Sequence, residues 1–137
     1  MNLNESVTQS PAIVANDFER LIELVEMTRG TLPELSFYLG QELERATIVT
    51  DADPESVQMG SSVRFHDHGS GKVHDIRLVY PADSSPAEGR ISVLTPVGSA
   101  LLGQQAGSVA LCRNAAGQVR PLTVVSVLPP PPDGALT

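Results

Sequence analysis

Two glutamates, Glu26 and Glu34, are the residues whose type and spacing are best suited to joint chemistry. They bracket the segment 27–33, so both would lie at the end of a hairpin if helices flank that segment. Paired carboxylates with open coordination positions suit Mg²⁺. The alternative is structural, since Glu34 favours a helix N-terminus and Glu26 can simply be solvated. We prefer the structural alternative and predict neither a metal site nor a catalytic residue there.

The histidines form a second candidate group, because His66, His68 and His74 have Asp67 and Asp75 beside them. Imidazole and carboxylate are suitable ligands for zinc or nickel. The alternation of neighbouring residues, however, places His66 and His74 on the polar face of adjacent strands and His68 in the turn between them. We interpret all three as solvated surface residues, and we predict no metal and no other cofactor.

Composition excludes several classes of function. The chain of 137 residues is enough for one compact domain plus a small appendage, and its formal charge of −7 argues against neutralising nucleic-acid phosphates. Its one cysteine, Cys112, excludes an intramolecular disulfide and is predicted to be buried. We find no glycine-rich phosphate loop, nucleophile elbow, signal peptide or membrane-spanning run. We therefore expect a cytoplasmic protein that is not an enzyme and contacts no membrane.

Helical periodicity is confined to the first third of the chain. Segments 17–28 and 34–47 repeat apolar residues at helical spacing and are separated by only a few residues, which predicts an antiparallel hairpin. At 1.5 Å per residue each arm is about 18–21 Å long. The apolar positions are Phe18, Leu21, Ile22, Val25, Leu35, Leu39, Leu43 and Ala46.

Beyond residue 62 the period of the pattern changes to two, which indicates strands. We predict strands around Val63–His66, Ile76–Tyr80, Ile91–Leu94, Ser108–Arg113 and Val119–Leu128. The expected organisation is a flexible leader 1–15, a helical hairpin 16–48, a linker 49–61, a domain 62–128 and a proline-rich tail 129–137. Together these elements predict a small α+β protein.

The segment Ile91–Gly103 combines a strand, a capped helical turn and a glycine stop. Proline ends the strand because it cannot donate to a ladder, and Thr95 can cap a helix whose first residue is Pro96. Gly103 can adopt the left-handed conformation that closes a helix. A strand is thus expected to lead into a short helix through a tight corner.

This segment, together with Ser62–Phe65, closely resembles the C-terminal domain of the Gre transcript-cleavage factors and of their shorter relatives, the Rnk (regulator of nucleoside diphosphate kinase) family. The resemblance extends from about Asp17 to Leu128. It implies an FKBP-like domain, with an antiparallel twisted sheet and one short helix, that follows a short N-terminal antiparallel helical hairpin. A proline isomerase pocket is not expected, because the sheet region has only Phe65 and Tyr80 as aromatic residues.

The resemblance also implies a partner, RNA polymerase. In the cleavage factors a long coiled coil enters the secondary channel, and acids at its tip help to hold a catalytic magnesium ion. The arms predicted here are about half as long. We therefore expect a noncatalytic, monomeric regulator that docks at the rim of the secondary channel and competes with Gre factors. The alternatives are a cleavage factor with a shortened arm and an FKBP-like module that binds another protein.

Two sets of residues are candidates for contact with a partner. The first is the loop and helix of the motif, and the second is the tip of the hairpin. The motif set is Thr95, Pro96, Val97, Gly98, Ser99, Leu102 and Gly103, and the tip set is Glu26, Arg29 and Glu34.

Overall fold

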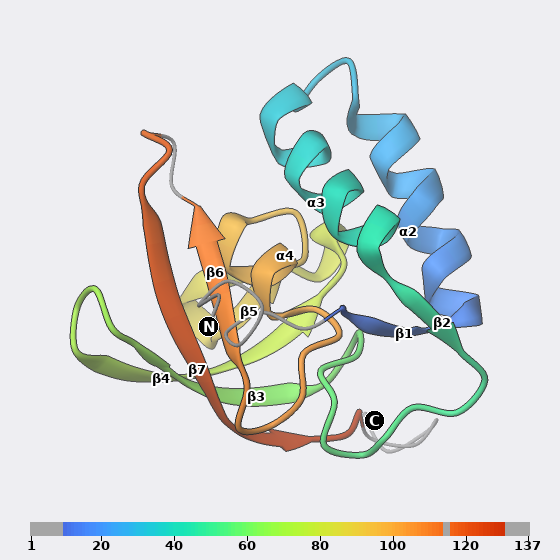
Figure 1. Cartoon of the computed structure of the whole chain (residues 1–137). Helices are drawn as coiled ribbons and strands as arrows, with labels where there is room; N and C mark the ends of the chain where they lie inside the picture. Colours follow the sequence, from blue (N-terminus) through green and yellow to red (C-terminus); the bar gives the residue numbers. More distant parts are fainter. Residues whose placement is uncertain (1–9, 114–115, 131–137) are drawn as a thin grey trace, which may run out of the picture.

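A helical hairpin inserted between two short strands opens the fold (Figure 1), which a computed structural model describes for residues 10–113 and 116–130. Strand β1 (Ala12–Val14) leads directly into α2 (Ala15–Thr28), and α3 (Pro33–Arg45) returns to β2 (Thr47–Val49). The two strands pair in parallel, with Ile13 opposite Ile48. Both ends of the hairpin are therefore fixed at one small sheet.

The prediction of a flexible leader 1–15 is wrong for its last part, and residues 1–9 lie outside the described residues. Ile13 is fully buried, and the backbone N–H of Thr47 donates to the Pro11 carbonyl at 2.8 Å. The buried side chain of Gln58 donates to the Ala12 carbonyl at 2.7 Å and accepts from the Val14 N–H at 3.2 Å. A strand of three residues carries too little pattern to be recognised, and long-range hydrogen bonds order it.

The two predicted helices are present and pack as an antiparallel hairpin. With 14 and 13 residues, they are about 21 and 20 Å long at 1.5 Å per residue. Their packing does not require glycine at Gly40, since a Cβ there would lie 3.7 Å from Val25 Cγ1, an ordinary contact distance. The side chains that the hairpin buries are Leu21, Val25, Ser36, Leu39 and Leu43.

The second half of the chain forms a five-stranded sheet in the order β5-β4-β3-β7-β6. The strands are β3 (Ser62–Asp67), β4 (Lys72–Val79), β5 (Arg90–Ser92), β6 (Val109–Arg113) and β7 (Val119–Leu128). Three pairings are antiparallel, and β5 joins β4 in parallel after two 3₁₀ turns, Pro81–Asp83 and Pro86–Glu88. The predicted α+β class is confirmed, and the sheet is antiparallel as predicted except for the parallel pairing of β5 with β4.

The predicted linker 49–61 is packed into the protein over its second half. Val57 is fully buried, Met59 is 7% exposed, and the Val57 N–H donates to the Gln104 carbonyl at 2.8 Å. One hydrophobic cluster contains side chains from the hairpin, from this segment and from the sheet. Because that cluster is continuous, the hairpin is held at a defined angle to the sheet. The remaining boundaries of the predicted organisation stay predictions, and residues 131–137 of the tail lie outside the described residues.

Replacing Gly103 with alanine is expected to destabilise the fold by at least about 2 kcal/mol. Gly103 has φ +76°, and a Cβ there would lie 2.8 Å from the backbone nitrogen of Ala12. Gly40→Ala is the control, because its Cβ has room and alanine favours a helix by about 0.5–1 kcal/mol. Urea unfolding measures both variants. Equal stability of the two would contradict this account of how β1 is held.

Candidate docking site

Helix α4 (Pro96–Leu101) carries the motif and begins as its residues predict. Thr95 Oγ1 accepts a hydrogen bond from the Gly98 N–H at 3.0 Å, and Pro96 occupies the first turn. The Thr95 hydroxyl also donates to the Ser92 carbonyl at 2.7 Å. The cap therefore ties the start of α4 to the end of β5.

Gly98 serves the close approach of α4 to the preceding strand. A Cβ at this position would lie 2.9 Å from the Val93 Cα, closer than real Cβ atoms are found. The contact involves backbone, which cannot move aside as a flexible side chain can. Glycine is therefore required by packing at this point.

Burial corrects the list of candidate contact residues in the motif. Gly98, Ser99, Leu102 and Gly103 are buried, Ser99 at 3% exposure and Leu102 at 0%. Gly98, Leu102 and Gly103 support the core and are not accessible to a partner in this conformation, whereas Ser99 supports the core and also lines a groove beside α4. Thr95, Pro96 and Val97, the other candidate residues of the motif, are half-buried and form its accessible part. A short helix pattern could not show that α3 and β6 cover the other sides of α4.

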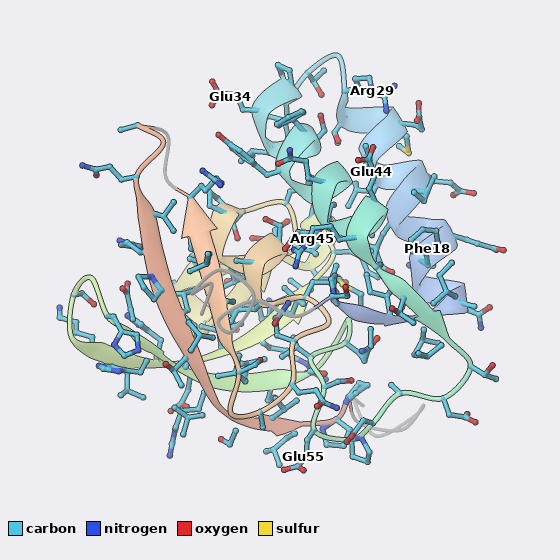
Figure 2. All side chains as sticks on the ribbon, viewed as in Figure 1. Phe18, Arg29, Glu34, Glu44, Arg45 and Glu55 are labelled. Atoms are coloured by element: carbon cyan, nitrogen blue, oxygen red, sulfur yellow. The ribbon has the colours of Figure 1, made fainter. Side chains whose placement is uncertain are left out.

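A groove of about 430 Å³ lies beside this accessible part, between α3, α4 and β6. Its walls are mixed: apolar side chains of α4 and β6 face polar and charged side chains of α3. Figure 2 shows Arg45 extending from the end of α3 toward α4, and its guanidinium forms an ion pair with Glu42. The lining residues are Tyr38, Gln41, Glu42, Glu44, Arg45, Pro96, Ser99, Ala100, Gln104, Ala110, Leu111 and Arg113.

The hairpin tip does not assemble its two glutamates into a metal site. The Glu26 carboxylate accepts a hydrogen bond from Arg29 Nη2 at 3.0 Å, and both side chains are exposed. Figure 2 shows Glu34 and Arg29 on opposite flanks of the tip. Within residues 10–113 and 116–130, no three His, Cys, Asp or Glu side chains are grouped to hold a metal ion. The tip is instead partly apolar, because Met27 is 79% exposed and Leu32 is 42% exposed.

All three histidines lie at the β3–β4 hairpin, but the predicted polar face is wrong for His74, which is half-buried and lies opposite the buried Phe65 on the core face of the sheet. The rings of His66 and His68 are in edge contact, with centroids 4.3 Å apart, and His68 Nε2 is hydrogen-bonded to Thr123 Oγ1 at 2.7 Å. His74 packs against Phe65 across the strand pair. These contacts are structural, and none of them forms a triad of metal ligands.

A buried carboxylate near that turn, Asp67, was predicted only as a neighbour of the histidines. Its side chain is 8% exposed and lies 3.5 Å from Arg120 Nη2. Burial opposes its ionisation, but N–H groups of Gly69 and Ser70 and the Arg120 charge outweigh burial and lower the pKa of Asp67. The predicted burial of the neighbouring Cys112 is confirmed, since this residue is 2% exposed. That burial raises the pKa of the Cys112 thiol and disfavours thiolate chemistry.

Tyr80 fastens the base of the hairpin to the sheet and was not recognised from the sequence in this role. Its hydroxyl donates to Asp17 Oδ1 at 2.9 Å, and the guanidinium carbon of Arg20 lies 4.2 Å from its ring centroid. Burial, followed by the Asp17 charge, raises the pKa of Tyr80. Tyr80 and Asp17 are 63 residues apart in the sequence, so no periodic pattern could have revealed their contact.

Comparison with known proteins agrees with this arrangement. The family described as "Transcription elongation factor, GreA/GreB, C-term" matches residues 51–129. The chain belongs to this family of transcription factors, which confirms the resemblance noted above. The match covers the sheet, α4 and the packed segment that precedes them.

Among its relatives, the chain is similar to the regulator of nucleoside diphosphate kinase of Escherichia coli K12. The two are 35% identical over 101 residues, which span 71% of this chain and 74% of the relative. The elongation factor GreA of Clostridium novyi is 35% identical over 69 residues, which span 49% of this chain and 43% of that factor. The likeness to the regulator thus includes much more of both chains.

One solved structure extends the likeness to the hairpin. The prokaryotic transcription elongation factor GreA/GreB from Nitrosomonas europaea superimposes with a TM-score of 0.67 at 35% identity. The match covers 86% of this chain and 98% of that one.

Within the described residues of the present chain, no helix is both long and apolar enough to cross a membrane.

Asp67→Asn is expected to lower the free energy of unfolding at pH 7 by about 1 kcal/mol, through the lost charge opposite Arg120. The folded-state pKa of Asp67 is lowered, so its contribution is present above the unfolded-state pKa of about 4 and is lost as pH falls through the folded-state value. The difference from wild type should therefore shrink below pH 4. Urea unfolding from pH 7 to pH 3 measures it, and a constant difference would contradict the assignment.

Tyr80→Phe is expected to destabilise the protein by about 0.5–1.5 kcal/mol, because it removes the hydrogen bond to Asp17. Amide hydrogen exchange should accelerate in α2 near Asp17 more than in the sheet. Tyr38→Phe is the matched control, since no hydrogen bond of the Tyr38 hydroxyl is found among residues 10–113 and 116–130. Unchanged exchange in α2 of Tyr80→Phe would mean that the core alone sets the hairpin angle.

Proposed function

We propose that this protein is a noncatalytic regulator of transcription that binds core RNA polymerase as a monomer. It docks near the rim of the secondary channel and competes there with Gre factors. It requires no cofactor and makes no direct contact with nucleic acid. Membership of the GreA/GreB family supports the kind of process, and the short hairpin supports the noncatalytic role.

The length of the hairpin is the observation that carries this proposal. Its helices have 14 and 13 residues, which gives a reach of about 20 Å from the small sheet at its base. The resemblance to the cleavage factors implies that an arm which delivers an acid to a polymerase active site is about twice as long. The short arm therefore suits a protein that occupies the entrance of a channel without reaching its centre.

The chemistry of the tip supports the same conclusion. A catalytic Mg²⁺ needs carboxylate oxygens with free coordination positions. Here Arg29 competes for the Glu26 carboxylate, and Glu34 projects from another flank of the tip. The exposed apolar side chains of Met27 and Leu32 are better suited to packing against a protein surface than to holding a metal.

The docking surface we propose consists of the accessible motif residues Thr95, Pro96 and Val97 and the adjoining groove. The motif residues are rigid, because the threonine cap and the close packing of Gly98 fix the start of α4. A rigid surface loses little entropy on binding. The hairpin tip, with Glu26, Arg29 and Glu34, forms the second proposed contact, at the far end of an arm held by Tyr80.

An assay of transcript cleavage by backtracked polymerase distinguishes a noncatalytic regulator from a cleavage factor with a shortened arm. We expect the wild-type protein to leave the cleavage rate within about twofold of the factor-free rate, because its arm is short and Arg29 already pairs with the Glu26 carboxylate at its tip. Excess protein should reduce Gre-stimulated cleavage several-fold through competition. A full-length Gre factor alone is the positive control.

The double variant Glu26→Gln/Glu34→Gln identifies the alternative. Under the proposal it still competes through the motif surface, more weakly than wild type because two residues of the tip contact are altered, and neither protein stimulates cleavage. If wild type stimulates cleavage and the double variant does not, the protein is a cleavage factor with a shortened arm. Failure to co-purify with core polymerase or to compete for it would favour an interaction module with another partner.

A further inference from the structure

Strand β6 lies at the edge of the five-stranded sheet and pairs, among the described residues, only with β7. Ala110 and Cys112 point into the core, whereas Leu111 is half-buried and Arg113 is exposed. An edge strand presents a row of backbone N–H and C=O groups that can pair with another chain. Which residues supply those groups depends on the phase of the ladder with β7.

A proline in β7 fixes that phase. Pro121 lies opposite Leu111, has no N–H, and directs its carbonyl to the other side, where it accepts from the His68 N–H at 3.1 Å. Hydrogen-bonded and non-hydrogen-bonded pairs alternate in an antiparallel ladder. The N–H and C=O of Leu111 therefore point away from β7, toward the free edge, and so do those of Val109 and Arg113. The Val124 N–H donates to the Ser108 carbonyl at 2.9 Å, as this phase requires.

The opposite edge of the sheet is closed by the chain itself. Strand β5 has three residues, and Ser85 exchanges backbone hydrogen bonds of 2.9 and 3.0 Å with Arg90. Along β6, by contrast, the outward groups of Val109, Leu111 and Arg113 have no hydrogen-bond partner within residues 10–113 and 116–130. The strand has no proline, glycine or bulge that would prevent pairing.

The groove of about 430 Å³ adjoins this open edge. Ala110, Leu111 and Arg113 line one side of it, and Pro96 and Ala100 of the α4 region line another. A strand added to β6 would direct every second side chain toward this space, as in peptide recognition by strand addition. Backbone donors and a side-chain groove thus occur side by side.

Charge indicates one feature of the incoming segment. Arg113 is exposed and has no acidic partner among the described residues, whereas Arg45 is already paired with Glu42. A carboxylate on the added strand would pair with Arg113 at the end of β6. The apolar floor made by Pro96 and Ala100 suits small or branched apolar side chains.

We propose that the edge of β6 receives an extended segment of a partner protein as a sixth strand. Its backbone pairs with Val109, Leu111 and Arg113, its inward apolar side chains enter the groove, and a carboxylate meets Arg113. In taking core RNA polymerase as the source of this segment, the inference rests on the proposed function. It adds a mode of binding, main-chain pairing, to the docking surface.

Leu111→Pro tests the pairing directly. Proline removes an outward N–H that β7 does not use, and edge strands tolerate proline where the N–H faces solvent. We expect at least tenfold weaker binding to core polymerase. The thermal unfolding temperature of the free protein should fall by only a few degrees. Leu111→Val, which keeps the N–H and an apolar side chain, is the matched control and should bind within about threefold of wild type.

Amide hydrogen exchange supplies a readout that depends on the backbone alone. The amides of Leu111 and Arg113 should exchange at least tenfold more slowly in the wild-type complex than in the free protein. Arg113→Glu provides a second variant that leaves the strand backbone unchanged, and it should also weaken binding about tenfold.

The outcomes separate the two proposals. Polymerase binding by wild type that is unaffected by Leu111→Pro and Arg113→Glu, with unchanged exchange at Leu111, would overturn strand addition and leave the proposed function standing. No polymerase binding by wild type would overturn the proposed function, and with it this source of the strand. Protection of the same amides on concentration-dependent dimerisation of the free protein would overturn the proposal in favour of a second copy at this edge.

Discussion

The meeting of three chain segments at Gly103 is the constraint on which the rest of the structure depends. The Gly103 N–H donates to the Val57 carbonyl at 2.7 Å, and its carbonyl accepts from the Ala12 N–H at 3.1 Å. One residue therefore joins the strand before the hairpin, the segment after it and the end of the α4 motif. Its positive φ and the lack of space for a Cβ make glycine necessary there. The Gln58 hydrogen bonds to Ala12 and Val14 and the burial of Ile13 act with this junction to fix β1 relative to the sheet.

The junction explains why the hairpin and the sheet behave as one body. The parallel pairing of β1 with β2 sets both ends of the hairpin, and Tyr80 holds its base from the other side. The hydrophobic cluster then continues from Leu39 in α3 to Leu101 in α4 without interruption. The groove, the accessible motif residues and the tip are thus presented to a partner at fixed relative positions, which favours binding through several contacts at once.

Local patterns predicted what depends on neighbours in the sequence. The threonine cap, Pro96 in the first helical turn, the left-handed Gly103 and the alternation of β3 and β4 all follow from the order of residues. Long-range contacts decided the rest. The burial of Ser99 and Leu102, the strand Ala12–Val14 and the parallel pairing of β5 with β4 require knowledge of which distant segments lie alongside. The tip acids show the same limit, because their closeness in sequence does not determine the directions in which they project.

The pairing of β1 with β2 also has an evolutionary consequence. Parallel strands require a crossover connection, and here the whole hairpin is that connection. The tip of the hairpin does not contact the residues that fix its base, so the length of the two arms can vary without a change in the rest of the fold. Seven residues inserted into each arm, close to two helical turns, would extend the tip by about 10 Å while keeping the buried face in register. Hairpins of very different length are therefore compatible with the same sheet, junction and core.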